Sequence, residues 1–428
     1  MKKLPELLCP AGNFEKLRAA VLYGADAVYL AGNAFGMRAA ADNFSLEQLR
    51  EAMIWAHKRG VRVHVTVNTM PRQGELAALE DYLRALASLG QYKLPESEFP
   101  GSDDALAYPD ALIVADLGVA ALVRQILPGA ELHVSTQAGA VNSADCMAWR
   151  GLGAKRIVLA RELSLADIRA IRAALPADLE LEAFVHGSMC VSVSGRCLLS
   201  NHFTGRDANR GMCTQPCRWN YRLYEIEEEK RPGDRLPVVE TDLGTFVMSS
   251  KDMCMIEHLG ELCEAGIASF KIEGRMKSAY YAAVTANAYR MALDAYGAGQ
   301  AYDARWKREL ESVSHRSYCT GYFFDDPMQN AQLCDAEGIR EGYIREKSYI
   351  ATAVGYDASR GVATFVQRNK LTAGDTVELI SPGMIGRAFC AEELTDPEGN
   401  ALESAPHPSM LFCLRVPFAV RAGDILRR

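Results

Sequence analysis

Residues 6–32 read ELLCPAGNFEKLRAAVLYGADAVYLAG and show the pattern on which the first half of the chain is built. Short apolar runs at 6–10 and 27–31 flank an amphipathic stretch at 15–23. Apolar runs of strand length that alternate with amphipathic stretches of helix length are typical of parallel strands joined by crossover helices. This segment therefore predicts a strand–helix–strand unit.

The same alternation continues along the chain. Further strands are expected at 62–68, 111–115, 131–137, 156–161, 179–186 and 269–274. Further helices are expected at 46–58, 76–89, 117–127, 143–152 and 165–173. Ser45 and Ser164 directly precede two of these helices and are expected to cap them, because a hydroxyl accepts hydrogen bonds from first-turn amides. Eight such strands close a barrel, so the predicted fold class is α/β with a TIM-like (β/α)8 barrel.

Two segments depart from this pattern. A Cys-rich insertion at 188–267 separates the seventh and eighth strands. From residue 348 onward, short alternating runs broken by turns predict a small C-terminal all-β barrel domain. The expected domains are therefore 1–300 for the barrel with its insertion, 301–342 for a connector and 343–428 for the β domain.

The composition restricts the class of protein. The 428 residues have a net charge of −7 and are 49% apolar, which excludes a disordered or collagen-like chain and confines any nucleic-acid site to a local patch. There is no export-type leader and no apolar run of about 18 residues, so we expect a cytoplasmic protein with no membrane partner. Twelve cysteines in a reducing compartment indicate metal or redox chemistry. The patterns HExxH, GxSxG, GxGxxG and Walker A are absent, which disfavours the usual hydrolase and nucleotide-dependent mechanisms.

Four cysteines of the insertion have a spacing that could hold a metal. Cys190, Cys197, Cys213 and Cys217 follow the pattern C-x6-C-x15-C-x3-C. Four thiolates complete either a zinc site or a [4Fe-4S] cluster. The long gaps favour the cluster over zinc, whose sites usually have short knuckles, and zinc remains the alternative metal. Buried thiols that bind nothing are the third interpretation.

The first part of the insertion has a net positive charge, in contrast to the negative charge of the whole chain. Residues 188–224 contain five arginines and a single acidic residue, Asp207. Arginines beside aromatic side chains are typical of contacts to RNA phosphates and bases, although they could also surround an anionic thiolate cluster. The candidate RNA-binding residues are Arg206, Arg210, Arg218 and Trp219.

Polar residues stand at the carboxyl ends of the predicted strands, where barrel enzymes hold their active sites. In FKIEGR at 270–275, the alternation places Lys271, Glu273 and Arg275 on one face of the eighth strand. These three side chains could hold a dicarboxylate ligand, or they could form a structural ion-pair network. The candidate catalytic residues are His186, Lys271 and Glu273. The candidate ligand-binding residues are Asn68, Gln137, Arg161 and Arg275.

Several blocks resemble the collagenase-like peptidase family U32, and together with the C-terminal domain they cover essentially the whole chain. The most specific block is EAFVHGSMCVSVSGRCLLS at 182–200; others are the opening stretch, NRGMCTQPCRWNY at 209–221, SSKDMC at 249–254 and FKIEGRMKSAYY at 270–281. The full-length form is similar to the branch that hydroxylates carbon 5 of the wobble uridine of tRNA in a prephenate-dependent reaction. The resemblance therefore implies that 5-hydroxyuridine is formed in the anticodon loop, with prephenate or a similar small diacid as a partner and a [4Fe-4S] cluster as cofactor.

The resemblance also implies which cysteines bind the cluster. Cys190, Cys197 and Cys213 match the family's ligands, and the fourth ligand is either Cys217 or Cys254. Two other functions stay open. One is a peptidase acting on collagen-like chains, and the other is a cluster-bearing accessory protein that works with a paralogue or as a homo-oligomer.

Overall fold

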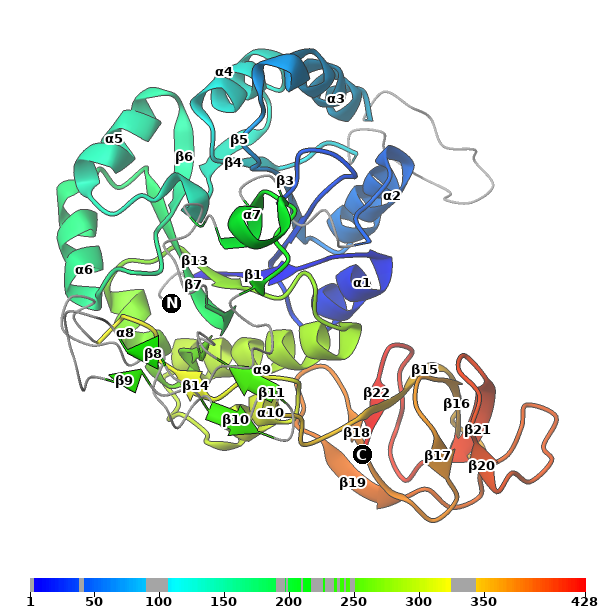
Figure 1. Cartoon of the computed structure of the whole chain (residues 1–428). Helices are drawn as coiled ribbons and strands as arrows, with labels where there is room; N and C mark the ends of the chain where they lie inside the picture. The colour runs from blue at the N-terminus through cyan, green and yellow to red at the C-terminus, as the bar shows by residue number, and fades with distance from the viewer. Residues whose placement is uncertain are drawn as a thin grey trace.

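The structure is a computed structural model (Figure 1). It describes residues 4–37, 42–89, 107–189, 197, 199–208, 211–216, 226–227, 235–236, 239–241, 244–246, 251–324 and 344–428.

A closed ring of eight parallel strands forms the centre of the larger domain. These strands are β1 (Glu6–Pro10), β2 (Ala27–Leu30), β3 (Arg62–Val67), β4 (Ala111–Val114), β5 (Glu131–Val134), β6 (Ala154–Val158), β7 (Glu180–Ser188) and β13 (Ser269–Ile272). Each strand pairs with the next in this order, and β13 pairs with both β7 and β1. The predicted TIM-like barrel is confirmed.

Helices surround the ring, as Figure 1 shows. They are α1 (Phe14–Leu22), α2 (Leu46–His57), α3 (Leu76–Ser88), α4 (Leu117–Ile126), α5 (Ser143–Gly151), α6 (Leu165–Ala174), α8 (Leu259–Glu264) and α9 (Ala279–Gly297), with 3-10 turns η1 (Gln73–Glu75), η4 (Thr136–Ala138) and η7 (Ile256–His258). The expected caps are confirmed, because Ser45 and Ser164 each form a capping box at the start of α2 and α6. No helix among the described residues is long and apolar enough to span a membrane.

The segment after β7 contains α7 (Leu199–Thr204) and two short hairpins. The hairpins pair β8 (Ile226–Glu227) with β9 (Arg235–Leu236), and β10 (Val239–Thr241) with β11 (Gly244–Phe246). The chain then returns to the barrel at β12 (Asp252–Cys254), which pairs antiparallel with β7. The last part of the segment expected as an insertion, with β12 and α8, therefore belongs to the barrel wall.

The range expected as a connector contains α10 (Arg305–Glu311), which packs against α9, and β14 (Tyr318–Cys319), which pairs with β12. The C-terminal domain contains β15 (Tyr349–Asp357), β16 (Val362–Gln367), β17 (Leu371–Thr372), β18 (Thr376–Ile380), β19 (Arg387–Cys390), β20 (Ser404–Ala405), β21 (Leu411–Arg415) and β22 (Ile425–Arg427). Six of these strands form one antiparallel sheet in the order β19-β18-β22-β15-β16-β21, and this sheet has its own apolar core. The expected all-β C-terminal domain is confirmed.

The C-terminal domain is fixed to the barrel by buried polar contacts. The guanidinium of Arg427 on β22 donates to Glu309 of α10 at 2.7 Å and to Ser312 at 2.8 Å. On α9, the side chain of Asn287 donates to the carbonyl of Met384 at 2.8 Å and accepts from the amide of Gly383 at 2.8 Å. The sheet therefore has a defined position beside α9 and α10.

Candidate active site at the barrel mouth

Charged side chains face one another inside the barrel. Lys271 of β13 donates from Nζ to Oε1 of Glu182 on β7 at 2.8 Å, and the other carboxylate oxygen of Glu182 accepts from Arg156 of β6 at 3.1 Å. All three side chains are buried. Burial alone would raise the pKa of Glu182, but the charges of Lys271 and Arg156 outweigh it and hold this pKa at about 2. Lys271 is therefore paired with Glu182, which was not among the candidate site residues.

Lys271 also reaches the aromatic lining towards the carboxyl ends of the strands. Its Nζ lies 4.7 Å from the ring centroid of Tyr29 and 5.5 Å from that of Phe184. The guanidinium of Arg161 lies 4.8 Å from the same Phe184 ring and donates to the carbonyl of Ser188 at 2.8 Å. The structure thus brings two of the predicted cations, Lys271 and Arg161, to one aromatic ring.

Arg275 and Glu273 follow β13 at the same end of the barrel. Arg275 is buried and donates to the hydroxyl of Thr66 at 3.0 Å and to the side-chain carbonyl of Asn43 at 2.9 Å. Glu273 accepts from the hydroxyl of Tyr29 at 3.4 Å. Lys271, Glu273 and Arg275 therefore lie in one region, but each has a partner from another part of the chain.

Asn68 connects the ends of three strands. Its side-chain amide donates to the hydroxyl of Ser135 after β5 at 3.3 Å, and its carbonyl oxygen accepts from the amide of Met37 at 3.3 Å. Gln137, two residues after Ser135, lies in η4. The two predicted amide residues therefore both follow the carboxyl ends of barrel strands, β3 and β5.

His186 lies in a different environment, among tyrosines. Its ring centroid is 5.9 Å from Tyr281, 5.4 Å from Tyr289 and 5.3 Å from Tyr318, and its Nδ1 is 3.4 Å from the hydroxyl of Tyr289. Burial lowers the pKa of His186 to about 3, so the imidazole is neutral near pH 7. Any proton transfer by His186 near pH 7 would begin from this neutral form.

The segment with α7 covers the mouth, and Figure 1 shows α7 at the centre of the ring. A Cβ on Gly211, whose φ is 86°, would lie 2.8 Å from the carbonyl oxygen of Gly36, which follows β2. Only a residue without a side chain fits this close approach in the left-handed region. Gly211 thus fixes the segment against the loop after β2.

Two candidate metal ligands can be placed in this segment. Cys197 is partly exposed and Cys213 is exposed. The hydroxyl of Ser200, just after Cys197, accepts from the amide of Thr214 at 3.1 Å, which ties the chain after Cys197 to the residue after Cys213. The amide of Gln215 donates to the sulfur of Cys213 at 3.4 Å.

Several candidate residues fall outside the described residues: Cys190, Cys217, Arg210, Arg218 and Trp219. Among the residues that the structure does describe, no three His, Cys, Asp or Glu side chains are grouped so that they could hold a metal ion. Arg206 is exposed, and Phe203, three residues earlier in the chain, is 50% exposed. The segment thus presents a cation and an aromatic ring to solvent.

Cys254, the alternative fourth ligand, has different surroundings. It lies on β12 opposite His186, is 6% exposed, and its sulfur is 4.0 Å from the hydroxyl of Tyr289. Burial raises the pKa of the Cys254 thiol to about 11. Cys254 is therefore enclosed by the barrel wall, whereas Cys213 is exposed on the segment over the mouth.

The residues that sequence reasoning missed lie inside the barrel. Glu182 and Arg156 complete the ion-pair network, and Tyr29 and Phe184 line the mouth. A signal for Glu182 was present, because LELEA at 179–183 alternates glutamate with leucine and so places Glu180 and Glu182 on one face of the strand.

Comparisons with known proteins cover both domains. Residues 12–333 match the sequence profile of peptidase family U32, and residues 345–427 match that of the peptidase family U32 C-terminal domain. The tRNA hydroxylation protein P1 of Bacillus subtilis is 35% identical over 100% of this chain and 95% of its own length. The tRNA hydroxylation protein P of Escherichia coli is 34% identical over 96% of this chain and 94% of its own length. A collagenase of Porphyromonas gingivalis is 30% identical over 88% of this chain and 86% of its own length.

Proposed function

The chain belongs to peptidase family U32, and from this premise we propose that it hydroxylates RNA and that its substrate is tRNA. The proposed product is 5-hydroxyuridine at the first anticodon position, formed in a prephenate-dependent reaction. The target uridine would leave the anticodon loop and enter the barrel mouth, since enzymes reach a base by taking it out of its stack.

The observation that carries this proposal is similarity over the full length of the chain. Two relatives named as tRNA hydroxylation proteins align with nearly all of this chain and nearly all of themselves. The alignment therefore includes the barrel, the cysteine-bearing segment and the C-terminal sheet. The exposed Arg206 and Phe203 on the segment over the mouth add a surface that suits an RNA loop.

We further propose that the segment over the mouth holds a [4Fe-4S] cluster. Its ligands would be Cys190, Cys197, Cys213 and Cys217. The exposed Cys213, whose sulfur accepts from the amide of Gln215, supports this segment as the site. Cys217 lies four residues from Cys213 in the sequence, whereas Cys254 is 6% exposed on β12. When bound, such a cluster would supply one-electron transfer beside the mouth.

The small diacid would bind below this segment. Arg161 comes from the chain after β6, Lys271 from β13 and Arg275 from the chain after β13, and their side chains lie towards the carboxyl ends of the strands. Guanidinium groups bind carboxylates in a bidentate way, so Arg161 and Arg275 would orient the ligand. Lys271 would add positive charge next to the Phe184 ring, against which a cyclic ligand could pack.

A peptidase is the second candidate, because one relative is named a collagenase. The geometry gives this candidate little support. Cys254 is the cysteine beside His186, and its pKa of about 11 leaves it protonated and weakly nucleophilic at neutral pH. Cleavage of gelatin by the purified protein, with or without added divalent metal, would support the peptidase function instead.

The test of the main proposal is nucleoside analysis by mass spectrometry of tRNA from a strain without this gene. We expect 5-hydroxyuridine and its derivatives to disappear and to return with the wild-type gene. Complementation with Cys213→Ala or Arg161→Ala then separates an enzyme from an accessory protein, because Arg161 lies at the mouth outside the buried ion-pair network. An enzyme needs both residues, whereas an accessory protein needs the cluster and tolerates loss of Arg161. Unchanged 5-hydroxyuridine after deletion would refute the proposal.

A further inference from the structure

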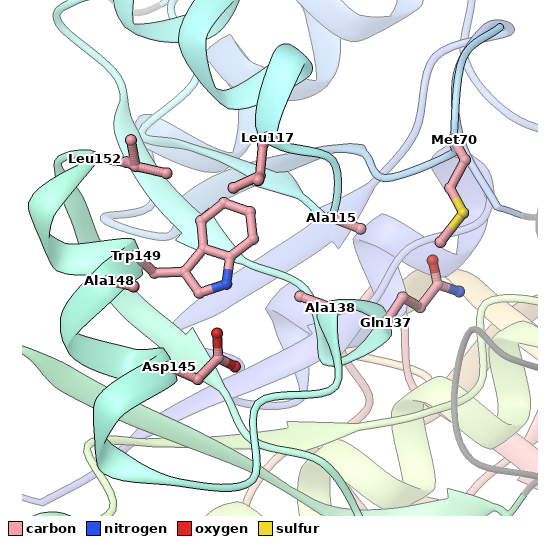
Figure 2. Close-up of a pocket in the computed structure, with 9 residues that line it drawn as sticks. All are labelled: Met70, Ala115, Leu117, Gln137, Ala138, Asp145, Ala148, Trp149 and Leu152. Carbon is pink, nitrogen blue, oxygen red and sulfur yellow. The ribbon is translucent and has the colours of Figure 1, made fainter.

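A pocket opens beside the barrel mouth, between the ends of the strands and helix α5 (Figure 2). Its volume is about 550 Å³, within the usual size of ligand sites. Met70, Ala115 and Gln137 contribute from the chain after β3, β4 and β5, and Asp145 and Trp149 contribute from α5. Neither the ion-pair network nor the cysteine-bearing segment accounts for this pocket.

Most of the lining is apolar. Met70, Leu117 and Leu152 are 41%, 60% and 46% exposed and are grouped at this one pocket. Figure 2 shows the indole of Trp149 between Leu117 and the carboxylate of Asp145. An aromatic ring with aliphatic neighbours forms a surface that suits a flat, largely apolar group.

Two polar side chains interrupt this lining. In the described part of the chain, neither the carboxylate of Asp145 nor the side-chain amide of Gln137 has a hydrogen-bond partner, although the backbone amides of both residues do. Burial raises the pKa of Asp145, so solvation of this carboxylate is already reduced. A partly desolvated acceptor favours a ligand that offers N–H groups.

The charge of the lining excludes some ligands. The nine described residues that line the pocket include one carboxylate and no Lys, Arg or His. A phosphate or another anion would therefore be repelled. A neutral heteroaromatic ring with N–H donors suits both the carboxylate and the apolar walls, and nucleobases have this chemistry.

The pocket also lies next to the barrel mouth, where the proposed RNA substrate would bind. Met70 and Gln137 each stand two residues after Asn68 and Ser135, the pair that is hydrogen-bonded at the mouth. A nucleotide next to one held at the mouth could thus reach the pocket. We propose that this pocket binds an unpaired base of the same RNA, with its N–H edge on Asp145 and its ring beside Trp149. This inference rests on the proposed RNA substrate.

The test uses the full-length protein and an RNA hairpin with an anticodon loop. Each loop base in turn is replaced by an abasic nucleotide, and Kd is measured for wild type and for Asp145→Ala. At one position near the target base we expect the abasic change to weaken wild-type binding about tenfold, as stacked bases usually do. Asp145→Ala should weaken binding of the intact hairpin. In this variant, the abasic change at the position near the target base should cost little further affinity, whereas abasic changes at the other positions should act as in wild type.

A second variant and a control complete the design. Leu117→Ala should also remove the affinity loss caused by the abasic change at the position near the target base. Leu117 is 60% exposed, so its truncation leaves the core intact. Glu47→Ala removes the same charge from the first turn of α2, outside the pocket, and should leave every Kd unchanged. The pocket assignment alone would be overturned if wild type binds the hairpins but the affinity losses from Asp145→Ala and from each abasic change simply add. A hairpin that does not bind wild type would overturn the RNA substrate as well.

Discussion

Lys271 on β13 and Glu182 on β7 form a buried ion pair, with 2.8 Å between Nζ and Oε1, across the two strands that close the barrel. Arg156 shares the same carboxylate. The residue that we expected to face a ligand is thus also part of the contact between the seventh and eighth strands of the ring.

Breaking this ion pair from one side should destabilise the protein strongly. Lys271→Met leaves a buried carboxylate with one partner fewer and should lower the free energy of unfolding by about 3–5 kcal/mol. The double variant Lys271→Met with Glu182→Leu should lose less than the sum of the single changes, because no lone charge remains. Urea unfolding of the four proteins measures this coupling. Lys155→Met on the exposed side of β6 is the control and should change stability by less than about 0.5 kcal/mol.

The pH dependence of stability should carry the signature of Glu182. Its pKa is about 2 in the folded chain and about 4.3 in an unfolded chain. A lowered pKa stabilises the fold fully above the unfolded value, and this contribution, roughly 3 kcal/mol, is lost as the pH falls from about 4.5 towards 2. Urea midpoints measured between pH 6 and pH 3 should therefore fall more steeply for wild type than for the double variant without the carboxyl group. If the urea midpoints of the two proteins fell equally with pH, the lowered pKa of Glu182 in the folded chain would be contradicted.

The iron content of variants should show whether Cys217 or Cys254 is the fourth cluster ligand. Cys254→Ala should keep the wild-type iron content and visible absorption after anaerobic purification. It should cost only about 1 kcal/mol of stability, because a small buried group is removed. Cys213→Ala and Cys217→Ala should each lose iron. Loss of iron from Cys254→Ala, with Cys217→Ala unaffected, would reverse the assignment.

Arg427 should control whether the two domains unfold together. It is buried between Glu309 and Glu378, so Arg427→Met leaves two carboxylates without this partner and should cost about 3–5 kcal/mol. Calorimetry should show one transition for wild type and two for the variant. The exposed pair Arg415–Glu393 offers a control, since Arg415→Met should leave the single transition within about 0.5 kcal/mol of wild type. A single transition in Arg427→Met would mean that the other contacts suffice.

The strands and helices of the barrel could be predicted because their signals are local. The strand expected at 62–68 is Arg62–Val67, and the helix expected at 46–58 is Leu46–His57. Apolar periodicity and the cap at Ser45 act over a few residues, so a sequence reports them directly. The number of strands then indicated a barrel, because eight parallel strands close in that way.

The sequence by itself thus determined the eight barrel strands, their order and the cysteine spacing, but not β12, α8, α10 or β14. Only the tertiary structure decided which side chains meet. Lys271 pairs with Glu182, 89 residues away, because barrel closure brings β13 beside β7. Cys254 is buried because β12 pairs with β7, and the pocket at Asp145 exists because loops after three strands meet α5. Such contacts depend on how strands close and helices pack, and no pattern within a short stretch of sequence encodes them.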